Sequence, residues 1–157
     1  MKNNEVSFRA DKDIRLEVRG VEPRVIKTNA IKFRVSNGLL KYDLRDDLKT
    51  WSSIHGVKDI KISTKDPRGT WLGKRRYGGD LKIELDEDRL KVINHLFVEK
   101  YLKSVVGSEM PKSWPIEALK AQAIASRTYV LNQLKKKVSF DVTANNSSQV
   151  YLGIESE

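Results

Sequence analysis

Cysteine is absent from the 157-residue sequence, and histidine occurs only as His55 and His95. The lack of cysteine excludes disulfide bonds and metal sites built from thiolates. Two histidines without cysteine also argue against a structural zinc site. We therefore expect no bound metal and no other cofactor.

Long apolar runs are missing as well. No stretch is long and apolar enough to span a bilayer, and the first residues, MKNNEVSFRADKD, contain no apolar signal-peptide segment. The sequence therefore predicts a soluble chain. A protein whose export signal or anchor had been removed would give the same pattern.

Several catalytic motifs cannot be found. The sequence has no Gly-rich phosphate loop, no G-x-S-x-G elbow and no H-E-x-x-H motif. Neither histidine lies near a serine or aspartate in a recognisable nucleophile motif. Chemistry that depends on these motifs is therefore not indicated.

Positive charge is in excess. Lysine and arginine total 30 against 21 aspartate and glutamate residues, a formal net charge of +9. Such a surface attracts nucleic acid, anionic lipid or acidic wall polymer, and it also simply keeps a protein soluble. Charge alone does not decide among these partners.

The first two-thirds of the chain has the alternation of β-strands. Short alternating segments continue to about residue 97, and residues 81–94 are predicted to form a hairpin around the turn DEDR. Leu81, Ile83 and Leu85 share one face of its first strand. The interval KDPRGTWLGKRRYGG (65–79) is the clearest loop, although part of it could be strand.

The pattern changes at residue 98. Apolar residues spaced as in a helix run from Val98 to Val106, and Gly107 is predicted to end that helix. A second, longer helix should begin near Pro115 and reach about Lys136, where a lysine cluster (135–137) suits the helix dipole. Small or apolar residues occupy nearly all sides of this helix, which predicts a central helix packed on more than one side.

Two charges interrupt the apolar stripe of this second helix. Lys120 and Arg127 project near its middle, where an unpaired charge is unfavourable. Each should therefore reach water or meet a carboxylate. After this helix, the segment SFDVTANNSSQVYLG is predicted to form a strand, a polar turn and another strand that begins near Gln149. The fold class is therefore α+β.

Glu109 lies in the stretch VVGSEMPKSWP, between Gly107 and two prolines. A carboxylic acid held by rigid elements in a partly apolar cleft can act as a general acid near neutral pH. A surface or capping role is the alternative. The local pattern alone does not decide between the two.

The basic motif WLGKRRY (71–77) interleaves aromatic and basic residues. It could grip single-stranded nucleic acid, stack on sugar rings or form an ordinary exposed strand. All three interpretations stay open at the level of sequence.

The segment YLKSVVGSEMPKSWPIEALKAQAIASRTYVL resembles the signature of the stage II sporulation protein D family, which includes amidase-enhancer proteins. RRYGGDLKIELDEDRLKVINHLFVEKYL before it and FDVTANNSSQVYLGIESE after it are similar to the flanking segments of that family. The likeness extends over about residues 75–157. Residues 1–70 are a variable, β-rich lead-in, and we expect one domain over 1–157.

The resemblance implies a lytic transglycosylase of the bacterial envelope, acting outside the cytoplasm on peptidoglycan strands without stem peptides. Glu109 of the S-E-M-P motif would protonate the oxygen between N-acetylmuramic acid and N-acetylglucosamine. It would then take the proton of the muramic acid 6-hydroxyl, which closes to a 1,6-anhydro sugar. One carboxylate suffices for this chemistry, and Asp141 is interpreted as structural.

The resemblance also implies further residues that line or support the cleft: Lys120, Gln122, Arg127, Tyr129, Gln149 and Tyr151. Trp114 could form an apolar wall that stacks on a sugar face, or it could pack beneath the second helix.

Relatives of this family normally continue beyond YLGIESE with another strand-rich segment. We therefore expect this chain to be a truncated or processed piece whose sheet another chain or segment completes. Alone, it should be weakly active or inactive and should tend to associate.

Two other functions remain as alternatives. One is a wall-binding or amidase-enhancing module that holds glycan without cutting it, with a cell-wall amidase as partner. The other is a nucleic-acid-binding module, which the family resemblance disfavours. No nucleic acid is expected as a partner.

Overall fold

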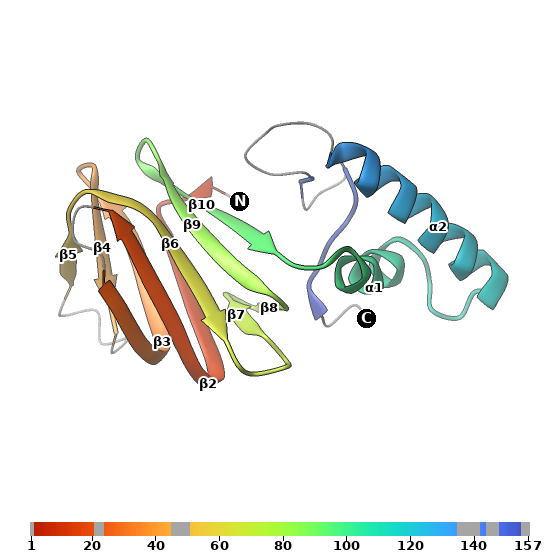
Figure 1. Cartoon of the computed structure of the whole chain (residues 1–157), viewed down its shortest axis with the longest axis horizontal. Coiled ribbons are helices and arrows are strands. Elements are labelled where there is room, and N and C mark those ends of the chain that lie inside the picture. Colours follow the sequence, from red (N-terminus) through yellow and green to blue (C-terminus); the bar gives the residue numbers. More distant parts are fainter. Residues whose placement is uncertain (1, 21–23, 45–50, 135–141, 144–147, 155–157) are drawn as a thin grey trace. The chain divides into compact units, whose positions relative to one another are not determined.

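The computed structural model describes residues 2–20, 24–44, 51–134, 142–143 and 148–154. The chain divides into two compact units, Met1–His95 and Leu96–Glu157. The first unit contains the strands and the second contains both helices (Figure 1). The α+β class predicted from the sequence is confirmed, whereas the single domain over 1–157 stays a prediction.

The first unit is an antiparallel sheet in which β2 and β3 form the longest pair. Its path runs β1-β10-β9-β6-β2-β3-β4-β5, and the short hairpin β7–β8 joins through β2. The strands are β1 Lys2–Asn3, β2 Glu5–Gly20, β3 Arg24–Ser36, β4 Leu39–Asp43, β5 Ser52–Ile54, β6 Val57–Thr64, β7 Thr70–Leu72, β8 Arg75–Tyr77, β9 Asp80–Asp86 and β10 Arg89–His95.

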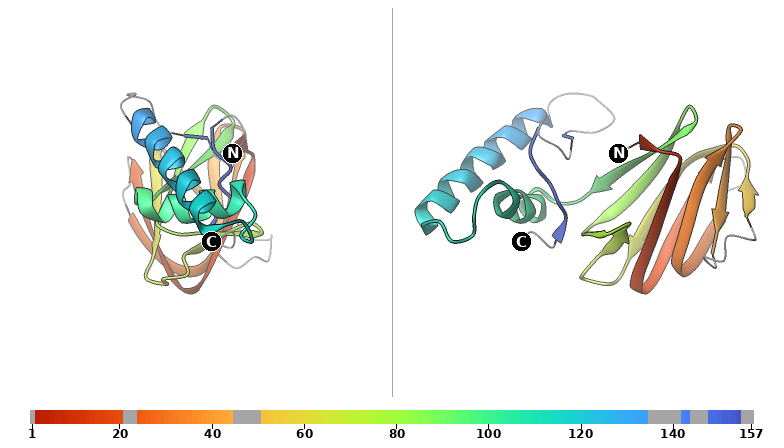
Figure 2. Two further views of the ribbon diagram at one scale, coloured as in Figure 1. Left: turned by 90° about the vertical axis from the view of Figure 1, so that its right-hand side faces the viewer. Right: turned by 180° about the vertical axis from the view of Figure 1, so that it is seen from behind.

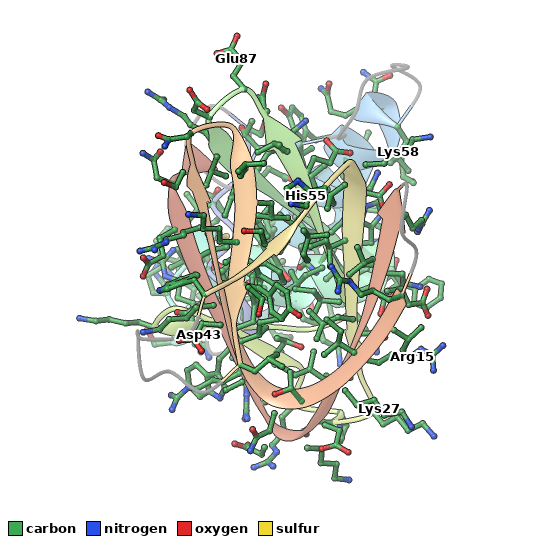
Figure 3. All side chains as sticks on the ribbon, turned by 90° about the vertical axis from the view of Figure 1, so that its left-hand side faces the viewer. Arg15, Lys27, Asp43, His55, Lys58 and Glu87 are labelled. Atoms are coloured by element: carbon green, nitrogen blue, oxygen red, sulfur yellow. The ribbon has the colours of Figure 1, made fainter. Side chains whose placement is uncertain are left out.

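The core of this unit follows from the alternation along the strands. Every second residue of β2 is buried at its two ends, and a register shift between Arg9 and Ile14 separates these two stretches. Phe8 of β2 and Phe33 of β3 meet edge to face, with ring centroids 6.1 Å apart. Figure 3 shows the strands curving around side chains of the interior.

The predicted hairpin is confirmed as β9 and β10. Leu85 lies opposite Leu90, and Ile83 lies opposite Val92. Ile83 and Leu90 are almost fully buried. Glu87 occupies the turn with φ of 54° and points away from the strands (Figure 3). The interval 65–79 is partly strand, since it contains β7 and β8.

The second unit is built around α1 (Val98–Glu109) and α2 (Ile116–Gln133). The two helices cross at a steep angle, and the segment 148–154 passes beside α1 (Figures 1 and 2). In the part of the chain that the structure describes, no helix is long and apolar enough to cross a membrane.

The expected end of the first helix at Gly107 is wrong, because α1 continues to Glu109. Glycine disfavours a helix by only about 1 kcal/mol, which neighbouring contacts easily offset. Pro111 gives the actual stop: the residue before a proline avoids helical angles, and Met110 is extended at φ −133° and ψ 143°.

The second helix is more exposed than its composition predicts. In α2 the buried residues are Ser126 and Val130, whereas Ile116 and Ile124 are each 62 % exposed. Pro115 is the N-cap residue, so the first helical residue is Ile116. The lysines at 135–137 lie outside the described residues.

The expected strand from Gln149 is not formed in the described residues 148–154, which have no strand pairing. Val150 instead directs its N–H to a side chain of α1. The preceding predicted strand and turn fall mostly outside the described residues, as does Asp141.

Candidate functional site

Glu109 is the last residue of α1, so a rigid helix fixes its backbone. Two hydrogen bonds close this end of the helix: Met110 donates its backbone N–H to the carbonyl of Val106 at 3.1 Å, and Ser108 Oγ donates to the carbonyl of Ser104 at 2.7 Å. The Glu109 side chain is exposed. The sequence therefore places this carboxylate at a defined point on the surface of the second unit.

The segment after α2 contacts this carboxylate. The backbone N–H of Val150 donates a hydrogen bond to Glu109 Oε1 at 2.6 Å. Within the described part of the chain, Glu109 forms no ion pair. One oxygen is thus oriented by the backbone, and no described cation occupies the other.

Tyr101 lies two turns earlier on α1 and is buried. Its hydroxyl donates to Gln149 Oε1 at 3.1 Å, and its ring lies 5.3 Å from that of Tyr151. Burial, followed by the nearby Tyr129 and Glu109, raises the pKa of Tyr101 to about 12. The Tyr101 hydroxyl therefore keeps its proton at neutral pH and can donate a hydrogen bond to Gln149.

The predicted residues Gln149 and Tyr151 are both buried, at 8 % and 6 % exposure. They lie against α1 and flank Val150, whose N–H reaches Glu109. Among the predicted site residues, Gln149 and Tyr151 are therefore the chain neighbours of the residue that contacts Glu109.

Arg127 meets a carboxylate, which is one of the two predicted alternatives. Its Nε and a terminal nitrogen each donate to Glu99 of α1 at 2.8 Å. This bidentate bond lowers the pKa of Glu99 and raises the pKa of Arg127. The pair links the two helices.

Lys120 also meets a carboxylate, but within its own helix. Its Nζ lies 2.8 Å from Glu117 Oε1, and both side chains are mostly exposed. Gln122 likewise bonds within α2, donating to Ser126 Oγ at 3.2 Å. Neither side chain is held by a contact to Glu109.

Trp114 precedes α2 and is 51 % exposed. Its backbone N–H donates to the carbonyl of Pro111 at 3.1 Å, which forms a turn between the helices. About half of its surface is thus accessible, and stacking on a sugar and packing beneath the second helix both stay predictions for Trp114.

Three groups at this site were not singled out as functional from the sequence. In the sequence, Tyr101 is only one member of the apolar stripe of α1, and nothing marks Glu99 as the partner of Arg127. Val150 contributes a backbone N–H, which any residue except proline supplies. Side-chain type could not identify them, because their roles depend on tertiary contacts.

No group of three or more histidine, aspartate or glutamate residues in the described ranges is arranged to hold a metal ion. The residues around Glu109 are tyrosine, glutamine and backbone amide. Their chemistry suits hydrogen bonding and stacking.

Residues of the basic motif WLGKRRY contact other side chains of the first unit. The guanidinium carbons of Arg9 and Arg76 each lie 4.8 Å from the ring centroid of Trp71. Arg76 also pairs with Asp11 and is only 11 % exposed. Cation-π contacts therefore occupy Trp71, which makes it a poor free surface for stacking on a base.

Comparison with known proteins gives three findings. The stage II sporulation protein family, SpoIID, matches residues 86–157. An uncharacterized protein of Brachyspira hyodysenteriae is 41 % identical over 99 residues, which cover 61 % of this chain and 26 % of that protein. The amidase enhancer of Bacillus subtilis is 46 % identical over 52 residues, which cover 33 % of this chain and 7 % of that protein.

No solved structure matches this chain. The matched parts amount to about a quarter, or less, of the relatives' own lengths. The family match nevertheless covers the whole Glu109 site, with both helices and the segment 148–154. Residues 86–157 are thus similar to the stage II sporulation protein family, and part of the chain is similar to an amidase enhancer.

Proposed function

We propose that this protein acts on the bacterial cell wall as a lytic transglycosylase, with Glu109 as the single general acid and base. The observation that carries the proposal is the exposed Glu109 carboxylate. A backbone N–H orients one of its oxygens, and no described cation pairs with it. A carboxyl group that is not tied to a cation can give up and accept a proton during one reaction cycle.

The substrate proposed is a glycan strand of peptidoglycan without stem peptides. Glu109 donates its proton to the oxygen that joins N-acetylmuramic acid to N-acetylglucosamine, and the bond from that oxygen to the anomeric carbon breaks. The muramic acid 6-hydroxyl attacks the anomeric carbon and returns its proton to Glu109. No water is consumed, and the muramic acid end leaves as a 1,6-anhydro sugar.

The other described carboxylates of the second unit support a one-acid reaction. Glu99 is bound to Arg127, and Glu117 is bound to Lys120. An ordinary glycoside hydrolase needs a second carboxylate beside the first. Here the substrate hydroxyl takes the role of that second group.

The remaining predicted residues divide by exposure. Trp114 and Lys120 are exposed and are proposed to bind sugar, by stacking and by hydrogen bonding. Gln122, Tyr129 and Arg127 are partly exposed and are proposed to line the binding surface. Gln149 and Tyr151 are proposed to support it from beneath.

A second function is supported by one relative. The B. subtilis protein is named an amidase enhancer. A module that binds glycan and stimulates a cell-wall amidase would need the same surface without the proton transfer. Under either function the protein would work in the bacterial envelope, outside the cytoplasm.

The two functions are separated by incubating denuded glycan strands with wild type and with Glu109→Gln, followed by mass analysis of the products. Anhydro products from wild type alone support the transglycosylase. Glycan binding by both proteins without any product supports the amidase-enhancing module. Equal product from both proteins removes Glu109 from its proposed role.

A further inference from the structure

The three consecutive residues 149–151 all contact α1. Gln149 accepts a hydrogen bond from Tyr101, Val150 donates one to Glu109, and the ring of Tyr151 packs on that of Tyr101. Tyr101 thus holds the residues on both sides of Val150. The chain is fixed before and after the peptide N–H that reaches the carboxylate.

Tyr101 and Glu109 come from separate turns of one rigid helix but contact adjacent residues. They are eight residues apart on α1, which corresponds to about 12 Å of rise along a helix. Tyr101 contacts Gln149 and Tyr151, and Glu109 accepts a hydrogen bond from Val150 between them. Contacts on both sides of Val150 therefore restrain the position of its N–H, and we call them the brace.

The contacts of Tyr101 with Gln149 and Tyr151 are protected from water. Tyr101, Gln149 and Tyr151 are 5 %, 8 % and 6 % exposed. A buried hydroxyl that lost its acceptor would retain the cost of desolvation, so the native pairing is strongly preferred. The exposed Glu109 has no comparable burial to fix its side chain.

We propose that Tyr101 is a positioning residue for Glu109, which acts through Gln149 and Tyr151 to aim the Val150 N–H at Oε1. This inference rests on the proposed function for its catalytic consequence. The orientation of the carboxylate itself can be measured without any turnover. The brace also assigns Gln149 and Tyr151 to the support of the site, because their polar or aromatic groups face Tyr101.

The test is a pH titration of the full chain followed by the amide proton shift of Val150 in ¹⁵N-resolved NMR. In wild type this amide should shift as Glu109 gains a proton, and in Glu109→Gln that shift should disappear. In Tyr101→Phe the shift should fall to less than half of its wild-type amplitude. Tyr42→Phe removes a matched hydroxyl from β4 and should leave the amplitude unchanged.

A wild-type amplitude in Tyr101→Phe would overturn the proposal, as would a Val150 amide that does not titrate in wild type. If Tyr101→Phe fails to fold, Gln149→Met removes the same hydrogen bond from the other side and should give the same reduced amplitude. An unchanged amplitude in Gln149→Met overturns the proposal.

Activity gives a separate outcome. Loss of one hydrogen bond in the brace should lower kcat for glycan cleavage about 3- to 10-fold while KM changes little, because Tyr101 is buried and acts through its neighbours. If wild type cleaves no glycan but the NMR amplitude falls in Tyr101→Phe, the positioning role stands and the proposed function fails. If wild type cleaves glycan and Tyr101→Phe keeps both its kcat and its amide amplitude, the positioning role fails alone.

Discussion

Arg127 of α2 binds Glu99 of α1 through two hydrogen bonds, each 2.8 Å long. The planar guanidinium matches the two carboxylate oxygens, a geometry that a lysine ammonium cannot reproduce. This pair explains why a cation lies on the apolar stripe of α2. It also makes the packing of the two helices sensitive to pH.

The Arg127–Glu99 pair should stabilise the second unit at neutral pH but not in acid. Because Arg127 lowers the pKa of Glu99, the stabilisation is present above the ordinary glutamate pKa and is lost as pH falls through the lowered value. Glu99→Gln should therefore melt a few degrees below wild type at pH 7. Thermal melts followed by the helical circular dichroism signal would measure this.

The difference in Tm between Glu99→Gln and wild type should disappear once the pH falls below the lowered pKa of Glu99. Arg127→Lys serves as the companion variant, since it keeps the charge but loses the bidentate geometry. A Tm difference that is the same at pH 7 and pH 3 would contradict the assignment.

A charge cluster on the first unit should also stabilise the fold at neutral pH but not in acid. Lys82 and Lys91 lie 2.8 Å and 3.4 Å from Glu84, and the hydrogen bond from Lys82 is the main cause of the lowered pKa of Glu84. Glu84→Gln should lower the free energy of unfolding by at most about 1 kcal/mol at pH 7. This loss should fade as pH falls through the lowered pKa of Glu84.

Urea unfolding at pH 7 and pH 3 would test the Glu84 prediction. Glu87→Gln is the matched control, because Glu87 points away from the strands and forms no ion pair with the described residues (Figure 3). Equal effects of Glu84→Gln at both pH values would show that its lysine partners are not the cause.

The sheet core depends on the β10 register. Leu90 is fully buried and lies opposite Leu85. Leu90→Ala should lower the free energy of unfolding by about 2 to 5 kcal/mol, because it removes buried methyl groups and leaves a cavity. Leu39→Ala, at a 37 % exposed position, is the control and should cost far less. Equal losses in urea titrations would contradict the observed difference in burial between Leu90 and Leu39.

Trp114 should affect glycan binding more than stability. With 51 % of its surface exposed, its removal leaves little cavity, so Trp114→Ala should change the free energy of unfolding by only about 0.5 kcal/mol. Loss of a stacking surface should raise KM for denuded glycan several-fold with a smaller change in kcat. A large fall in Tm with unchanged KM would assign Trp114 to packing.

The strands and the β9–β10 hairpin could be predicted because the alternation of apolar and polar residues is a local pattern that the sheet preserves. The end of α1 was harder to locate: Gly107 is a common stop signal, but Pro111 acts through the residue before it and sets the boundary at Glu109. The composition of α2 also predicted more burial than the structure shows. Small and apolar residues indicate what a helix can bury but not what covers it.

For the site, the sequence makes Glu109 a candidate and predicts that Arg127 reaches water or meets a carboxylate. It could not identify Glu99 as that carboxylate, nor the Val150 amide as the partner of Glu109. Both contacts join residues far apart in the chain. One of them uses a backbone group that has no side-chain signature.

Cleavage of denuded glycan by wild type and by Glu109→Gln is the most direct test of the proposed chemistry. Wild type should release 1,6-anhydro products, and Glu109→Gln should release them at least about 100-fold more slowly, as expected for loss of a general acid. Glu87→Gln should match wild type. Equal rates for Glu109→Gln and wild type would contradict the proposed role of Glu109.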